Sequence, residues 1–318
     1  IISLVSLPDF DPNKRQNITD TNFINRATKG VYEFGSVFKT FTLAAALNEG
    51  IINPKTKFQN LEKSIKCGKN TISEYDQKIP ENLTAEEILI RSGNIGSVRI
   101  GQAIGIEKFK NFLNDLNLMD AIKFDIEEIG QPIQFNWGKC KLATTSYGHG
   151  ITTTILQLAN AYAIIGNGGY KIYPTLIKKH SYFKKERILN KNISKNLIQI
   201  LRKVVTTKEG TASLANVSGY EVTGKTGTAE KIKNGGYSRK KINTFASIFP
   251  ASNPKYSLVV MLDEPKTNSD YIYHYRDGSG IKYKGTPFNT AGWTTVEVAG
   301  QIIEKIGPIL ATKYIQVY

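Results

Sequence analysis

Residues 35–48 read GSVFKTFTLAAALN. The apolar positions follow a helical pattern that Gly35 precedes, and Gly50 stands where a C-terminal capping glycine is expected. A helix that begins at Ser36 carries Lys39 one turn later on the same face, within reach of the Ser36 hydroxyl. Because the aromatic and alanine residues around it leave little polar surface, we expect this helix to bury Lys39. A lysine that burial keeps neutral can take the proton of a serine and make it a nucleophile.

The spacing S-x-x-K alone is a weak indicator, because it occurs five times in the chain, at Ser36, Ser181, Ser238, Ser252 and Ser279. Only Ser36 follows a glycine and begins a long apolar helix. The simpler alternative, that Lys39 is a surface lysine, is hard to reconcile with so apolar a helix.

Two further motifs follow in order, Ser92-Gly93-Asn94 and Lys225-Thr226-Gly227. S-x-N recurs at Ser194, which we expect to cap the N-terminus of the next helix. Ser92 and Asn94 lie between two predicted helices, where side chains can face a cleft, although a capping turn alone would explain them. K-T-G occurs once, in a predicted strand whose glycines let a ligand approach closely. The ordered triple is typical of active-site serine enzymes that use lysine in place of histidine.

The 318 residues carry 42 Lys and Arg against 27 Asp and Glu, a net charge of +15. This favours an anionic neighbour such as a cell-wall polymer or a lipid surface, with most lysines simply solvated. No basic run is interleaved with aromatic residues, so no nucleic-acid partner is expected. No metal or nucleotide motif is present, and we expect no metal and no organic cofactor. His149, in a glycine-flanked loop, is expected to be a cleft-wall or structural residue and not a base.

Cys67 and Cys140 are far apart, and we expect two separate thiols, with a disulfide as the alternative. The longest apolar run, 155–165, contains Gln157 and Asn160 and is shorter than the ~20 residues that span a bilayer. The chain begins with isoleucine. We therefore interpret it as a fragment without its targeting segment.

Apolar periodicity predicts an α+β fold. A capping box at Thr84 and Glu87 marks one helix start. We expect strands at 1–7, 220–228, 243–249 and 256–263, a polar loop at 271–284, and helices at 36–48, 85–91, 95–103, 107–116, 152–165, 195–207 and 294–306. The first strand would join the last three in an antiparallel sheet flanked by helices, and the inserted helices would form a second lobe. The active site would lie between the two lobes.

With these motifs in place, the chain resembles the transpeptidase domain of class B penicillin-binding proteins along nearly its whole length. Beyond the three motifs, the resemblance lies in residues 25–28, 32–36, 147–151, 157–159, 224–230 and 263–265. Thr286-Pro287-Phe288 and residues 290–293 resemble the cell-division type, penicillin-binding protein 3, more than the elongation type. Gly93 departs from the family, which has a small side chain there, and this would loosen the turn.

The resemblance implies a penicillin-binding/serine β-lactamase-like transpeptidase fold. A sheet lobe would span about 1–30 and 216–318, and an all-helical lobe about 31–215. It also implies an N-terminal membrane anchor and pedestal module outside this chain. The catalytic domain would then stand on the periplasmic side of the inner membrane.

The resemblance also implies a role for each catalytic residue. Ser36 would attack the penultimate D-Ala carbonyl of a peptidoglycan stem peptide, and Lys39 would accept its proton. Ser92, with Lys225 beside it, would relay a proton to the departing D-Ala, and Asn94 would hold the substrate amide and Lys39.

In the same way, the backbone N–H groups of Ser36 and Thr228 would form the oxyanion hole. Lys225, Thr226, Gly227 and Thr228 would bind the terminal carboxylate of the D-Ala-D-Ala end. An amine from a neighbouring stem would resolve the acyl-enzyme, and a β-lactam would stall there. A membrane glycan synthase and divisome proteins are the implied partners.

Two alternatives remain open from the sequence. A serine β-lactamase or D,D-carboxypeptidase shares the fold and hydrolyses its acyl-enzyme, for which class A lactamases use a glutamate and an asparagine. Glu127 and Glu128 are the candidates for that glutamate. The other alternative is a penicillin-binding sensor or divisome scaffold without turnover.

Overall fold

The computed structural model describes residues 1–318 except 12, 15–22, 179–185, 234–235, 286–287 and 316–318. Of the positions singled out above, Ser181, Thr286 and Pro287 lie outside the described residues. No described helix is long and apolar enough to cross a membrane.

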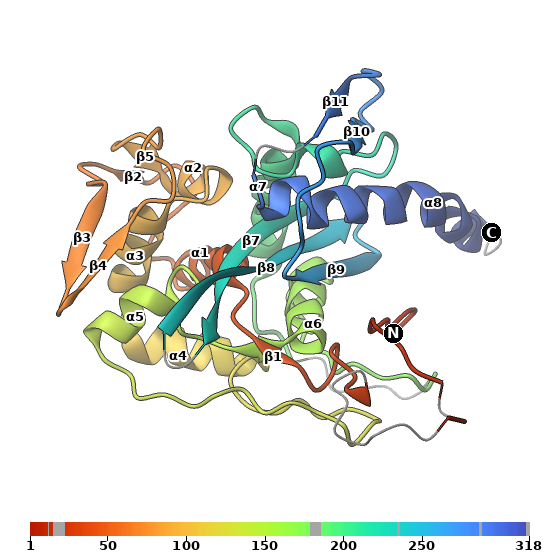
Figure 1. Cartoon of the computed structure of the whole chain (residues 1–318). Coiled ribbons are helices and arrows are strands. Elements are labelled where there is room, and N and C mark those ends of the chain that lie inside the picture. Colours follow the sequence, from red (N-terminus) through yellow and green to blue (C-terminus); the bar gives the residue numbers. More distant parts are fainter. Residues whose placement is uncertain (12, 15–22, 179–185, 234–235, 286–287, 316–318) are drawn as a thin grey trace.

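The centre of the molecule is an antiparallel sheet of three strands in the order β7 (Thr223–Lys233), β8 (Gly236–Phe249) and β9 (Tyr256–Asp263). Successive side chains of β9 point to opposite faces. The Tyr256 hydroxyl donates to the Leu310 carbonyl of α8 (Thr295–Ile315), whereas the Ser257 hydroxyl donates to the Ala159 carbonyl of α6 (Ile155–Gly166). Helices therefore cover both faces of the sheet (Figure 1).

The predicted strand at residues 1–7 is wrong. The segment has no regular structure, and Ile2, Val5 and Leu7 are each more than two-thirds exposed. The Ile1 amino group instead donates to the Thr175 carbonyl. An apolar run forms a strand only when a partner strand is available, and among the described residues the central sheet consists of the three later strands.

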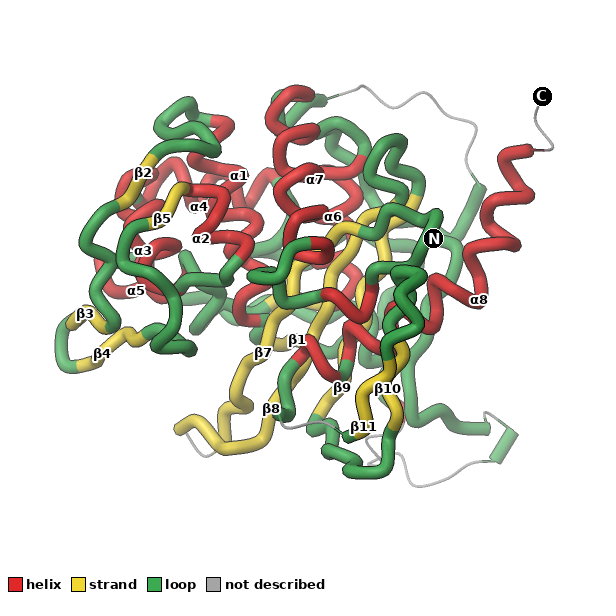
Figure 2. Tube along the Cα trace, turned by 90° about the horizontal axis from the view of Figure 1, so that it is seen from above, coloured by secondary structure: helices red, strands yellow, loops and turns green. Residues whose placement is uncertain are grey.

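The segment around Ser36 continues into a buried helix, as predicted. A 3-10 turn, η2 (Gly35–Phe38), leads into α1 (Lys39–Asn48), in which nine of ten residues are buried. Packed against α1 are α2 (Ala85–Ile90), α3 (Asn94–Ile104), α4 (Ile106–Asp115) and α7 (Lys191–Thr206). Figure 2 shows the helices near α1 gathered on one side of the sheet, with α8 on the other.

The helix boundaries test two capping predictions. Thr84 and Glu87 form the predicted capping box at α2. The predicted cap at Ser194 is wrong, because α7 begins at Lys191 and Asn190 accepts the Asn192 N–H at 2.9 Å. Ser194 lies inside the first turn, and its hydroxyl donates to the Ile165 carbonyl. The polar first turn of α7 gave no apolar periodicity to mark its start.

Short strands and turns add to this frame. The segment 271–284, predicted to be a loop, contains a hairpin formed by β10 (Ile272–His274) and β11 (Lys282–Lys284). Helix α8, predicted to end at residue 306, continues through Pro308 to Ile315. The other two-stranded ladders pair β1 (Val31–Tyr32) with β6 (Thr153–Thr154), β2 (Lys57–Phe58) with β5 (Leu83–Thr84), and β3 (Ser64–Cys67) with β4 (Asn70–Ser73). Two further 3-10 turns are η3 (Ser213–Ala215) and η4 (Ala291–Trp293).

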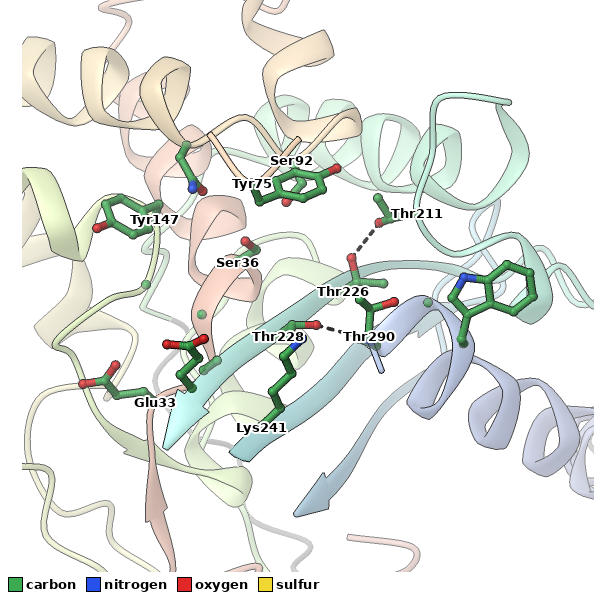
Figure 3. Close-up of a pocket in the computed structure, with 18 of the residues that line it drawn as sticks. Glu33, Ser36, Tyr75, Ser92, Tyr147, Thr211, Thr226, Thr228, Lys241 and Thr290 are labelled. Carbon is green, nitrogen blue, oxygen red and sulfur yellow. Dashed lines mark hydrogen bonds between the residues drawn. The ribbon is translucent and has the colours of Figure 1, made fainter. Parts of the chain in front are cut away.

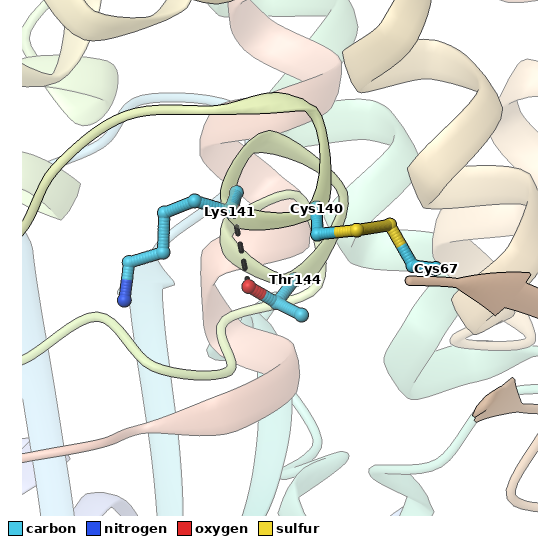
Figure 4. Close-up of a disulfide and its surroundings, with 4 residues drawn as sticks. All are labelled: Cys67, Cys140, Lys141 and Thr144. Atoms are coloured by element: carbon cyan, nitrogen blue, oxygen red, sulfur yellow. Dashed lines mark hydrogen bonds between the residues drawn. A yellow bond between two sulfur atoms is a disulfide. The ribbon is translucent and has the colours of Figure 1, made fainter. Parts of the chain in front are cut away.

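The expectation of two separate thiols is wrong. Cys67, at the end of β3, forms a disulfide with Cys140 in α5 (Lys139–Thr145), with the two Cα atoms 5.4 Å apart (Figure 4). The disulfide ties the β3–β4 hairpin to the helical part of the molecule. A separation of 73 residues in the sequence gave no indication of this pairing.

Candidate active site

A cavity of about 680 Å³ lies where η2, the turn before α3, β7, η4 and the 147–150 loop meet. Ser36 lines its centre. Figure 3 shows the Ser36 side chain between Ser92 on one wall and the β7 threonines on the other. Polar side chains from segments far apart in the chain therefore surround one hydroxyl.

Two close backbone approaches hold the Ser36 segment. Gly35 has φ +57°, and a Cβ there would lie 3.0 Å from the Thr228 carbonyl oxygen of β7. Gly148 has φ +85°, and a Cβ there would lie 1.9 Å from the Gly35 carbonyl oxygen. Only glycine fits such contacts without a shift. They bring Ser36 beside β7 and the 147–150 loop.

Lys39 is fully buried and bonded to the S-x-N motif. Its Nζ donates to Asn94 Oδ1 at 2.6 Å, to the Ser92 carbonyl at 2.5 Å and to Ser92 Oγ at 3.3 Å. Burial lowers the pKa of Lys39 to about 7, against the opposing charge of Glu74. At neutral pH a large fraction of Lys39 is therefore uncharged and able to accept a proton.

Lys225 approaches the same hydroxyl from β7. Its Nζ donates to Ser92 Oγ at 2.8 Å and to the Thr226 carbonyl at 3.2 Å. Burial first, and then the charge of Lys39, lower the pKa of Lys225 well below its ordinary value. Ser92 Oγ thus links two buried amines. The backbone of Ser92 adopts the left-handed conformation (φ +60°) that non-glycine residues rarely take.

A residue that sequence reasoning missed supports this corner. The buried Glu74 carboxylate accepts the backbone N–H groups of Asn94 at 2.7 Å and Ile95 at 2.9 Å, and so caps α3 from the end of the β3–β4 hairpin. The Ser73 carbonyl accepts Asn94 Nδ2 at 2.8 Å. The sequence held one faint signal, the absence of a capping side chain at Gly93.

The sequence predicted that Gly93 would loosen the turn before α3, but the turn is well held in the structure. Gly93 has φ −63° and ψ 129°, which any residue adopts, and a Cβ there would meet Glu74 Oε1 at an ordinary 3.5 Å. The Glu74 bonds hold the turn without a side chain at this position.

The K-T-G strand alternates between two environments. Lys225 and Gly227 do not line the cleft, and a Cβ at Gly227 would lie 2.1 Å from the Phe34 carbonyl oxygen. Thr226 and Thr228 line the cleft. Thr226 Oγ1 lies 2.6 Å from the hydroxyl of Thr211, a residue not predicted from the sequence, and Thr228 Oγ1 accepts the Ala291 N–H at 3.1 Å.

The other end of the cleft is acidic and aromatic. It is lined by Glu33, Tyr147, His149, Glu230 and Tyr237. The His149 ring lies between the rings of Tyr147 and Tyr237, with centroids 5.7 and 4.7 Å away. His149 therefore lies in the cleft wall, as expected from its loop.

The two glutamates considered for a hydrolytic enzyme lie elsewhere. Glu127 is exposed, and Glu128 accepts the Asn25 N–H at 3.0 Å, and neither lines the cleft.

A serine at a helix start, an S-x-N hydroxyl between two buried lysines and a K-T-G strand define the class of penicillin-recognising serine proteins. Comparison with known proteins agrees with this class. Residues 1–279 match the family model of the penicillin-binding protein transpeptidase domain, and the chain belongs to this family.

Among its relatives, a probable peptidoglycan D,D-transpeptidase FtsI of Caulobacter vibrioides is 33% identical over 98% of this chain and 52% of its own length. A probable peptidoglycan D,D-transpeptidase PenA of Neisseria flavescens is 31% identical over 85% of this chain and 68% of its own length. The chain thus spans about half to two thirds of these relatives.

Solved structures confirm the predicted fold class. The transpeptidase domain of penicillin-binding protein 3 from Burkholderia pseudomallei superposes with a TM-score of 0.76 at 26% identity, covering 90% of this chain and 82% of that one. Penicillin-binding protein 3 of Mycobacterium tuberculosis, in complex with aztreonam, superposes with a TM-score of 0.75 at 25% identity, covering 89% of this chain and 64% of that one.

Proposed function

We propose that the chain is the catalytic domain of a peptidoglycan D,D-transpeptidase that cross-links stem peptides in septal wall synthesis and is acylated by β-lactams. The observation that carries the proposal is the Ser92 hydroxyl, which lies 2.8 Å from Lys225 Nζ and 3.3 Å from Lys39 Nζ beside the cleft of Ser36. Such a chain of groups can move a proton between a nucleophile and a leaving amine.

In the proposed acylation, neutral Lys39 takes the Ser36 proton as Ser36 Oγ attacks the penultimate D-Ala carbonyl. The backbone N–H groups of Ser36 and Thr228 stabilise the oxyanion, at about 3 kcal/mol per donor in comparable enzymes. The close packing of Gly35 on the Thr228 carbonyl supports this pairing of the two segments.

Collapse of the intermediate then breaks the peptide C–N bond. The proton held by Lys39 passes through Ser92 Oγ to the departing D-Ala nitrogen, and Lys225 stabilises the hydroxyl during the transfer. Thr226 and Thr228 bind the terminal carboxylate, and Gly227 allows β7 to lie against η2. The adjacent Thr211 hydroxyl adds a donor that the sequence did not suggest.

The proposal extends to the setting of the whole protein. A membrane anchor and pedestal would precede this domain, with the catalytic part on the periplasmic side and a glycan synthase and divisome proteins as partners. The Cys67–Cys140 disulfide supports an oxidising compartment, where such bonds persist. The division role is supported by the likeness to relatives named FtsI.

A β-lactamase or carboxypeptidase and a non-turnover sensor are the competing functions. The positions of Glu127 and Glu128 outside the cleft disfavour the lactamase that would use either of them. A sensor would acylate but release no D-Ala.

The deciding experiment follows the intact mass of the purified chain with a penicillin over hours, beside Ser36→Ala. A stable adduct on the wild type alone supports the transpeptidase, and D-Ala release from a stem-peptide donor then separates an enzyme from a sensor. Rapid loss of the adduct with hydrolysed drug would identify a lactamase. An adduct on Ser36→Ala would contradict the assigned nucleophile.

A further inference from the structure

The two ends of the cleft differ in chemistry on either side of Ser36. One end carries the hydroxyls of Thr211, Thr226 and Thr228, with Lys225 behind them. The opposite end carries Glu33, Glu230, His149 and two tyrosines. A transferase that joins two substrates needs a place for each, and the acidic end has no part in the steps proposed so far.

Glu33 is unusual among the buried carboxylates of the described residues. Glu74 accepts two backbone N–H groups, Glu86 pairs with Lys55 and Lys203, and Glu297 pairs with Arg276. Glu33, only 8% exposed, receives a single tyrosine hydroxyl, that of Tyr237, at 3.4 Å from each oxygen. Buried carboxylates are normally satisfied by a cation or by several donors.

The nearby lysines bind other groups and do not pair with Glu33. Lys141 donates to the Gly150 carbonyl and lies 3.8 Å over the Phe135 ring, and Lys241 donates to the Asn289 carbonyl. Within the described part of the chain, no ion pair of 4.0 Å or less involves Glu33. A cationic group that enters the cleft would therefore find an unneutralised carboxylate beside Ser36.

His149, expected from the sequence to be a wall residue and not a base, also places a proton acceptor in this end of the cleft. Its ring is held between Tyr147 and Tyr237, whose hydroxyl contacts Glu33. Burial lowers the pKa of His149, with Lys141 acting in the same direction and Glu33 and Glu230 opposing it. An imidazole that is neutral at pH 7 can accept a proton from an ammonium ion.

Building on the proposed function, we propose that this end of the cleft is the acyl-acceptor subsite, in which Glu33 binds a primary ammonium group and His149 takes its proton. The free amine nitrogen then attacks the ester carbonyl of the Ser36 acyl-enzyme. The new C–N bond forms, Lys39 takes the second proton from that nitrogen and returns it to Ser36 Oγ, and the C–O bond breaks. The products are an amide, free Ser36 and protonated His149.

The test measures how one acyl-enzyme divides between two nucleophiles. An N-acyl-D-alanyl thioester serves as donor and glycinamide as acceptor, and mass spectrometry gives the ratio of amide to hydrolysed acid. Since both products come from one acyl-enzyme, the ratio does not depend on the acylation rate. We expect Glu33→Gln and His149→Gln each to lower the ratio about tenfold or more at subsaturating glycinamide and pH 7.

Two controls isolate the role of the charge. Hydroxylamine, which is uncharged at pH 7, should be used almost equally by the wild type and by Glu33→Gln. Glu127→Gln, an exposed carboxylate away from the cleft, should leave both ratios unchanged. Raising the pH, which frees the amine in solution, should restore glycinamide use in His149→Gln.

The outcomes separate this inference from the proposed function. If the wild type forms neither product, the proposed function fails and the acceptor subsite fails with it. If both products form and the glycinamide ratio of both variants equals that of the wild type, the subsite alone is wrong. An equal loss with hydroxylamine and glycinamide in Glu33→Gln would also overturn it, because the defect would then not concern an ammonium group.

Discussion

The turn before α3 and strand β7 each supply a motif with a central glycine, yet the two regions are built differently. In the turn, Gly93 has ordinary backbone angles and room for a side chain, and the structure is held by the distant Glu74 carboxylate. In β7, Gly227 lies directly against the Phe34 carbonyl. One wall of the site thus depends on side-chain bonds, and the other on close backbone packing.

Gly227→Ala should have the largest effect on acylation, because its Cβ would lie 2.1 Å from backbone that cannot move without shifting η2. We expect a loss of about 3 kcal/mol in the free energy of unfolding, at the upper end of overpacking costs, with little remaining acylation. Urea unfolding and penicillin labelling measure both effects. A variant as stable and reactive as the wild type would remove the contrast between the two walls.

Removing the disulfide tests how far the other wall depends on its hairpin. Cys67→Ser should cost about 2–4 kcal/mol, typical for a disulfide. The loss should be accompanied by slower acylation, because the same hairpin carries Ser73 and Glu74 to Asn94. Thermal unfolding and labelling kinetics with and without reductant give the comparison. Unchanged labelling in a destabilised but folded variant would separate the hairpin from the site.

Glu74→Gln should act more locally. A buried N–H group left without its acceptor costs about 1–3 kcal/mol. The charge of Glu74 raises the pKa of Lys39 against burial, so its removal should lower that pKa below about 7. Acylation requires neutral Lys39. The acylation rate of the wild type should therefore rise as the pH passes through about 7, and that of the variant should rise at a lower pH. Labelling rates between pH 5 and 9 measure this, and a shift to higher pH would contradict the assignment.

Gly93→Ala should have the smallest effect and is the matched control for Gly227→Ala. The new Cβ makes only ordinary contacts, and the change in the free energy of unfolding should stay within about 1 kcal/mol. Penicillin labelling should remain near the wild-type rate. A large loss would show that this turn, too, requires a glycine.

The sequence predicted those parts of the fold whose signal is long and periodic. The buried helix around Lys39 and strand β9 lie where the apolar patterns indicated. Strands β7 and β8 overlap the predicted segments 220–228 and 243–249, but β7 continues to Lys233 and β8 already begins at Gly236. The strand at residues 1–7 failed because a short apolar run does not specify its partner. Two-residue ladders such as β1–β6 are too short to carry a pattern.

The candidate site divides in a similar way. The three motifs indicated Lys39, Ser92, Asn94 and Lys225. In the structure Lys39 Nζ donates to Ser92 Oγ and Asn94 Oδ1, and Lys225 Nζ donates to Ser92 Oγ. The support they receive from Glu74 was not predictable. It arises from tertiary contacts between distant segments, as does the Cys67–Cys140 pairing. The missing capping side chain at Gly93 showed that the helix start needed an acceptor, but nothing in the sequence identified Glu74 as that acceptor.

The packing around Gly35 also bears on how the chain folds. Its carbonyl touches Gly148, and its Cα faces the Thr228 carbonyl, so the Ser36 corner is complete only after three remote parts of the chain have met. Contacts of such long sequence separation form late, after the entropy of closing long loops has been overcome. Covalent labelling of Ser36 during refolding would therefore report when the last native contacts form, and a newly made chain would stay unreactive until then.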